Sequence, residues 1–126
     1  MTAPRFEPGP KAGGPLVRGF SGRGFLVDGV VHEGALLTPD NAKPWHAPAL
    51  ADLAEADVES LLGLEPPPEF LLLGTGAAMA FAPRAFVAAL EARGIGVEAM
   101  DSRAAARTWG LLRGEGRRIV AALMPL

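Results

Sequence analysis

The sequence predicts a single α/β domain with a mixed sheet. A short apolar segment at 69–73 precedes a helical segment at 83–93 and a second strand-like segment at 95–99. This order is typical of a βαβ unit, in which the two strands run parallel and the crossover is right-handed. A β-hairpin signal comes before this unit and another apolar segment follows it. We therefore expect parallel strands and a hairpin in one domain.

The chain length fits one domain, because 126 residues can bury a core large enough to fold without disulfides or metals. Residues 1–15 are rich in proline and glycine and poor in apolar side chains. We expect 1–15 to be a flexible tail and 16–126 to be the folded domain.

The composition excludes several classes of protein. A net charge of -2 offers no broad attraction for nucleic acid. With no cysteine, the chain has neither disulfides nor thiolate chemistry. The longest uncharged stretch, 70–83, is too short to span a bilayer, and the N-terminus lacks an apolar signal core. We expect a soluble protein that is neither exported nor embedded in a membrane.

A hairpin is predicted where the strand-like segments 24–27 and 30–33 flank Asp28-Gly29. This dipeptide tolerates the positive φ angles of a tight type I′ turn. We expect the second strand to continue to residue 37, before Pro39 ends the pairing. The preceding glycine-rich segment, 19–24, is interpreted as a flexible bend.

Helix signals occur in three places. Apolar residues near helical spacing run through 50–62, until Gly63 ends the pattern. Pro83 suits the first position of the 83–93 helix. Asp101 or Ser102 can cap a third helix that Gly114 ends. The last strand is expected at 117–124, with its direction left open.

Candidate site residues follow the two parallel strands, at the edge of the sheet where α/β proteins commonly bind ligands. Gly74 and Gly76 allow close approach to the backbone, and Thr75 adds a hydroxyl to an anion-accepting loop. Asp101 and Ser102 follow the second strand. The alternative is that Gly74-Thr75-Gly76 is only a tight turn, because neither nucleotide-binding fingerprint is complete.

The third helix carries further candidates. Arg103 and Arg107 lie one turn apart, on a face shared with Gly110, and Thr108 follows them. We interpret Gly110 as a point where a neighbouring element or a partner approaches closely, with a tolerated surface glycine as the alternative. Arg103 is otherwise a solvated side chain. For Arg107 the alternative is an ion pair with one of three carboxylates, Asp101, Glu33 or Glu98.

No catalytic or metal site is predicted. None of the three serines lies in a Gly-x-Ser-x-Gly nucleophile elbow. His32 and His46 lack the spacing of metal ligands and are interpreted as surface or packing residues. Trp45 and Trp109 are expected to pack in the core. The sequence therefore gives no reason to expect a cofactor.

Several motifs together resemble a known family: Val27-Asp28-Gly29-Val30, Glu33-Gly34, Trp45, Leu73-Gly74-Thr75-Gly76, Met100-Asp101, Arg107-Thr108 and Glu115-Gly116-Arg117. The chain resembles a small single-domain family of unknown biochemical function, which includes an assembly factor of mitochondrial NADH:ubiquinone oxidoreductase. The resemblance implies a three-layer α/β domain with a mixed central sheet and a non-catalytic role. Relatives commonly have Tyr-Asn where this chain has Trp109-Gly110.

Three functions are compatible with these observations. The leading hypothesis is an assembly or interaction protein that presents the Gly74 loop and the Arg107 helix to a protein partner, at a membrane-bound respiratory complex. Its expected location is the bacterial cytoplasm, or the mitochondrial matrix in a eukaryote. The alternative is an anion-binding domain or weak enzyme that uses Thr75, Ser102 and Arg107. In the third, these residues serve folding alone.

Overall fold

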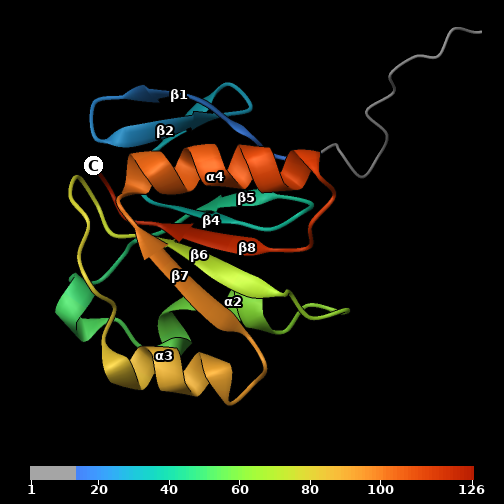
Figure 1. Ribbon diagram of the computed structural model, residues 1–126. Helices are drawn as coiled ribbons and strands as arrows, with labels where there is room; N and C mark the ends of the chain where they lie inside the picture. Colours follow the sequence, from blue (N-terminus) through green and yellow to red (C-terminus); the bar gives the residue numbers. More distant parts are fainter. Residues whose placement is uncertain (1–13) are drawn as a thin grey trace, which may run out of the picture.

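The computed structural model describes residues 14–126, which form two sheets (Figure 1). The strands are β1 (Val17–Ser21), β2 (Gly24–Val27), β3 (Val30–His32), β4 (Ala35–Leu37), β5 (Ala42–Pro44), β6 (Phe70–Gly74), β7 (Gly96–Met100) and β8 (Val120–Leu123). The helical segments are η1 (Leu50–Asp52), η2 (Glu55–Val58), α2 (Glu59–Leu62), α3 (Arg84–Glu91) and α4 (Ser102–Gly114). The central sheet has the order β5-β4-β8-β6-β7, and the smaller sheet has the order β1-β2-β3.

The central sheet is mixed, as the sequence predicts. β6 runs parallel to β7 and to β8, whereas β4 runs antiparallel to β8 and to β5. The strand-helix-strand unit formed by β6, α3 and β7 is confirmed. The direction of the last strand, which the sequence left open, is parallel to β6.

Two layers cover the central sheet. Figure 1 shows α4 and the small sheet on one face, and α2 and α3 on the other. Alternation along β6 supplies both cores: Leu71 and Leu73 pack on the α3 side, whereas Leu72 packs on the α4 side. Trp45 and Trp109 are both buried, which confirms their packing role. The three-layer architecture is therefore the expected one.

The hairpin of β2 and β3 is confirmed, with positive φ at Asp28 and Gly29. The predicted continuation of its second strand to residue 37 is wrong. β3 stops at His32, and β4 pairs in the central sheet. The chain changes sheets at Gly34, whose carbonyl oxygen accepts a 2.9 Å hydrogen bond from the Trp45 N–H. A Cβ there would lie 2.3 Å from the Trp45 carbonyl oxygen, so this contact requires glycine.

The flexible bend predicted at 19–24 is also wrong, because most of it belongs to β1 and the β1-β2 turn. β1 pairs antiparallel with β2. Phe20 stacks edge-on against its cross-strand neighbour Phe25, with ring centroids 6.0 Å apart. Cross-strand aromatic pairs stabilise a sheet. Here the Phe20-Phe25 pair stabilises a strand despite the low strand propensity of the glycines in this segment. β5 was not predicted either.

The helical pattern predicted in 50–62 is divided into η1, η2 and α2. Leu53 and Ala54 between them are extended. The Asp57 carboxylate accepts a 2.8 Å hydrogen bond from the Ala54 N–H, which starts a new helical turn instead of continuing the first. The end at Gly63 is as expected.

The predicted tail at 1–15 lies almost wholly outside the described residues and stays a prediction. At its boundary, the Pro15 carbonyl oxygen accepts a 2.8 Å hydrogen bond from the Trp109 indole N–H. Within 14–126, no helix is long and apolar enough to cross a membrane.

Candidate functional site

The carboxyl ends of β6, β7 and β8 meet at one edge of the central sheet, here called the carboxyl edge. The Gly74-Thr75-Gly76 turn and the start of α4 both lie there. The Thr75 N–H donates to the Met100 carbonyl oxygen at 2.8 Å, and the Ser102 N–H donates to the Gly76 carbonyl oxygen at 2.8 Å. The structure therefore brings the two predicted loops together.

Ser102 is the centre of this junction and is fully buried. Its hydroxyl donates to the Met124 carbonyl oxygen at 2.8 Å and accepts from the Gly76 N–H at 2.9 Å. One side chain thus joins the β6 turn, the start of α4 and the end of β8. This hydroxyl has no exposed surface to offer a ligand.

Thr75 is also bonded within the chain. Its hydroxyl lies 2.7 Å from the Ala78 carbonyl oxygen and 3.2 Å from that of Met100, and it accepts from the Ala80 N–H at 3.2 Å. A hydroxyl has one proton to donate, and a carbonyl oxygen takes it here. These contacts favour the tight-turn interpretation of this loop over an anion site.

Asp101 and Thr108 also have contacts within the chain. The Asp101 carboxylate accepts a 2.9 Å hydrogen bond from the Ala104 N–H, so Asp101 is the one of the two predicted caps that caps α4. The Thr108 hydroxyl lies 3.5 Å from the Met100 sulfur, a weak contact from α4 to β7.

The two arginines of α4 differ in their surroundings. Arg103 is exposed, with its guanidinium carbon 5.5 Å from the centroid of the Phe20 ring, a cation-π contact. Arg107 is exposed, and no hydrogen bond or ion pair joins it to another described residue. The ion pair with Asp101, Glu33 or Glu98 considered for Arg107 does not form.

Gly110 does not bring a neighbouring element close. A Cβ built on it would meet no atom within 4 Å among the described residues. The interpretation that a second element of this chain approaches there is wrong, because this side of α4 faces open space. A partner's approach and a tolerated surface glycine are the remaining explanations.

Sequence reasoning missed the exposed segment that follows the turn, residues 77–83, here called the apolar loop. Met79 is 51% exposed and Phe81 is 85% exposed. Figure 1 shows this loop, in yellow, running from the end of β6 to α3. The available signal was an apolar run between Gly76 and Pro83 that neither continues a strand nor starts a helix.

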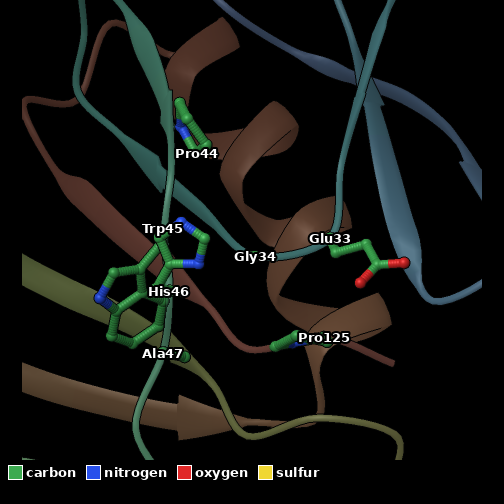
Figure 2. A pocket seen from close by; sticks show the side chains of 7 residues that line it. All are labelled: Glu33, Gly34, Pro44, Trp45, His46, Ala47 and Pro125. Atoms are coloured by element: carbon green, nitrogen blue, oxygen red, sulfur yellow. The ribbon is translucent and has the colours of Figure 1, made fainter.

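The same edge contains a hollow of about 310 Å³, here called the Trp45 hollow. It is lined by Glu33, Gly34, Pro44, Trp45, His46, Ala47 and Pro125 (Figure 2). Gly34 precedes β4, which is antiparallel to β8, and Pro125 follows β8. The lining comes from three separate segments, so no local motif could have predicted it.

An exposed ion pair lies at the opposite edge. Arg117, before β8, donates a 2.7 Å hydrogen bond to the carboxylate of Glu69, before β6. This hydrogen bond lowers the pKa of the Glu69 carboxyl. The pair joins the starts of two adjacent strands and is remote from the candidate site. Among residues 14–126, no cluster of three or more metal-ligating side chains occurs.

Comparison with known proteins gives the family. Residues 17–124 match the family described as protein of unknown function (DUF498/DUF598). The chain belongs to this family. The resemblance predicted from the motifs is confirmed.

Two relatives of the chain come from a bacterium and a vertebrate. An uncharacterized protein of Rhodobacter capsulatus is 39% identical over 98% of this chain and 94% of its own length. The NADH dehydrogenase [ubiquinone] 1 alpha subcomplex assembly factor 3 of Danio rerio is 32% identical over 89% of this chain. The match spans only 65% of that assembly factor's length.

Two solved structures share the fold. A crystal structure from Bordetella parapertussis has 35% identity and a TM-score of 0.80, covering 90% of this chain and 97% of that one. A solution structure from Bordetella pertussis, described as an Mth938-like domain, has 27% identity and a TM-score of 0.78, covering 98% and 92%. These similarities support the three-layer fold.

Proposed function

We propose that this chain is a non-catalytic interaction protein that helps to assemble a respiratory NADH dehydrogenase, and that the apolar loop contacts its partner. The observation that carries the proposal is Phe81, a large apolar side chain left 85% exposed at the carboxyl edge. Sequence similarity to an assembly factor of NADH dehydrogenase supports the choice of partner.

Burial of Phe81 by a partner would contribute favourable binding free energy. Fully burying a phenylalanine side chain is worth about 1.5–3 kcal/mol relative to leaving it in water. Aromatic residues are enriched where proteins bind each other. Met79, two residues away, is 51% exposed and adds an adaptable apolar side chain. Together they form a small anchor that a partner's apolar pocket can cover.

The base of the apolar loop is held in place. The Thr75 hydroxyl bonds Ala78 and Ala80, and Ser102 fixes Gly76 from the side of α4. A pre-organised loop loses less conformational entropy when it binds than a flexible one. We therefore assign the Gly74-Thr75-Gly76 turn and Ser102 a positioning role.

Arg107 supplies a charge for the same partner. Its guanidinium is exposed and bonded to no described residue, so binding does not have to break an existing pair. A carboxylate on the partner is its complement. The proposed place of action is the cytoplasm, or the mitochondrial matrix in a eukaryotic relative, beside the membrane that holds the complex.

The test is recovery of NADH dehydrogenase subunits from native detergent extracts by the tagged protein. We expect wild type to recover them, and Phe81→Ala to recover several-fold less at equal amounts of folded protein. Arg107→Ala should reduce recovery to a smaller extent. Val30→Ala removes another apolar side chain, 55% exposed, from β3 and should behave as wild type.

Two results would overturn the proposal. If wild type recovers no subunit of the complex, the assembly role is wrong. If Phe81→Ala recovers as much as wild type, the partner is kept but the apolar loop is not its binding surface.

A further inference from the structure

The Trp45 hollow has features that the proposed assembly role does not use. Its aromatic wall is rigid: the Trp45 indole N–H donates to the Asp57 carbonyl oxygen at 3.1 Å, and the Trp45 backbone N–H donates to Gly34 at 2.9 Å. Pro44 and Pro125 add two further apolar walls of low flexibility. The hollow therefore exists before any ligand arrives.

Two ionisable side chains line the hollow and have no partner among residues 14–126. Neither Glu33 nor His46 is hydrogen-bonded or ion-paired to a described residue, and both are exposed to solvent. Figure 2 shows Glu33 on one side of Gly34, with the indole and imidazole rings on the other. Polar side chains at the rim of an apolar hollow are typical of a site that orients a ligand.

The charges of the lining residues determine whether the hollow favours an anion or a cation. Glu33 is the carboxylate of the hollow, and none of its seven lining residues is lysine or arginine. An anion would meet the Glu33 charge with no lysine or arginine in the lining to offset it. A cation would be attracted both to the carboxylate and to the electron-rich face of an aromatic wall.

The size of the hollow limits the ligand to one small group. About 310 Å³ lies at the lower end of the range for ligand pockets, roughly 300–1,000 Å³. An alkyl chain against the prolines and indole, ending in a planar or tetrahedral cation near Glu33, satisfies both the apolar and the charged part of the lining.

We propose that the Trp45 hollow binds an organic cation, an alkylguanidinium or alkylammonium group. This group is supplied either by a basic side chain of a polypeptide or by a free small amine. The site is independent of Phe81 and Met79, and it does not depend on the assembly role of the apolar loop.

The test is a titration of the ¹⁵N-labelled protein followed by NMR, with EDTA present to remove metals. The probes are butylguanidinium, its neutral isostere butylurea, and Nα-acetylarginine amide. The amide signals of Gly34 and Ala47 and the indole signal of Trp45 report on the hollow. The indole signal of Trp109, which is bonded to Pro15 away from the hollow, is the internal control.

We expect saturable shifts of the hollow signals with butylguanidinium and much weaker binding of butylurea. Glu33→Gln should weaken the cation about two- to fivefold, the range of an exposed ion pair. Asp28→Asn makes the same charge change at the hairpin turn and should leave binding as in wild type. Tighter binding of Nα-acetylarginine amide than butylguanidinium would indicate a polypeptide source, and the reverse a free amine.

Equal binding of butylurea and butylguanidinium would overturn the proposal, as would a Glu33→Gln variant that binds as wild type does. Shifts that also move the Trp109 indole, or no shift at all, would show that the hollow is not a cation site. None of these results bears on recovery of partners through Phe81, so the two proposals fail separately.

Discussion

Ser102 occupies the space that a side chain at Gly74 would need. A Cβ built on residue 74 would lie 2.6 Å from the Ser102 Oγ and 2.9 Å from its Cα. The end of β6 and the start of α4 therefore depend on each other, and this contact fixes the turn from which the apolar loop leaves the sheet.

Gly74→Ala should destabilise the protein by about 1–3 kcal/mol, because the added methyl group forces Ser102 or the backbone to move. Gly110→Ala is its matched control. Its Cβ meets no atom within 4 Å, so α4 should gain up to about 1 kcal/mol from helix propensity. Urea denaturation of both variants measures the free energies of unfolding. Effects of equal size and sign would contradict the packing described at Gly74.

Ser102→Ala should cost about 1–3 kcal/mol, because it leaves the buried Gly76 N–H and Met124 carbonyl oxygen without their partner. Ser60 on α2 is exposed, so Ser60→Ala is not expected to reduce stability. Thermal or urea denaturation distinguishes the two serines. A Ser102→Ala variant as stable as wild type would show that this junction does not depend on the hydroxyl.

Thr75→Val should loosen the apolar loop while costing only about 0.5–1.5 kcal/mol of stability. The lost hydroxyl no longer bonds Ala78 and Ala80, so we expect faster hydrogen exchange of the Ala80 amide and weaker recovery of partner.

Thr38→Val is the control for loop position. The Thr38 hydroxyl accepts hydrogen bonds from the Asp40 and Asn41 amides in a similar turn, after β4 at the opposite edge. This variant should lose a similar amount of stability and recover partner normally. Equal loss of recovery in both variants would point to general destabilisation.

The Glu69-Arg117 pair predicts a pH dependence. The folded-state pKa of Glu69 lies below its ordinary value of 4.5 because Arg117 donates a hydrogen bond to the carboxylate. The stabilising contribution is therefore present above pH 4.5 and is lost as the pH falls through the lowered pKa.

Glu69→Gln should accordingly be slightly less stable than wild type at neutral pH, and the difference should shrink in acid and at high salt, where exposed pairs are screened. Urea denaturation across this pH range measures it. A difference that grows as the pH falls would contradict the assignment.

Local patterns predicted the βαβ unit and the hairpin, because each signal lies within a few neighbouring residues. The cap of α4 is also a local signal, because Asp101 lies only three residues from the Ala104 N–H that it accepts from. The separation of β3 from β4 could not be predicted, since it depends on the contact of Gly34 with Trp45, eleven positions along the chain. The pairing of β1 with β2 is supported by the Phe20-Phe25 contact. The number of glycines in 19–24, on which the prediction of a flexible bend was based, gives no information about this contact.

The candidate site divides in the same way. Sequence reasoning placed Gly74 and Ser102 at one edge because both follow parallel strands. It could not show that the polar groups of Ser102 are satisfied by Gly76 and Met124, which favours a positioning role over ligand binding. Exposure is a property of the whole fold, so only the structure could show that Phe81 is exposed and that Arg107 is paired with no described residue.

The most direct test of the account is site-specific photo-crosslinking from position 81 in cells. A photoreactive phenylalanine analogue replaces Phe81, and the same analogue at exposed Val30 is the control. The account predicts that position 81 crosslinks to a subunit or assembly intermediate of NADH dehydrogenase and that position 30 does not. Absence of that crosslink at position 81, or equal crosslinking from both positions, would contradict it.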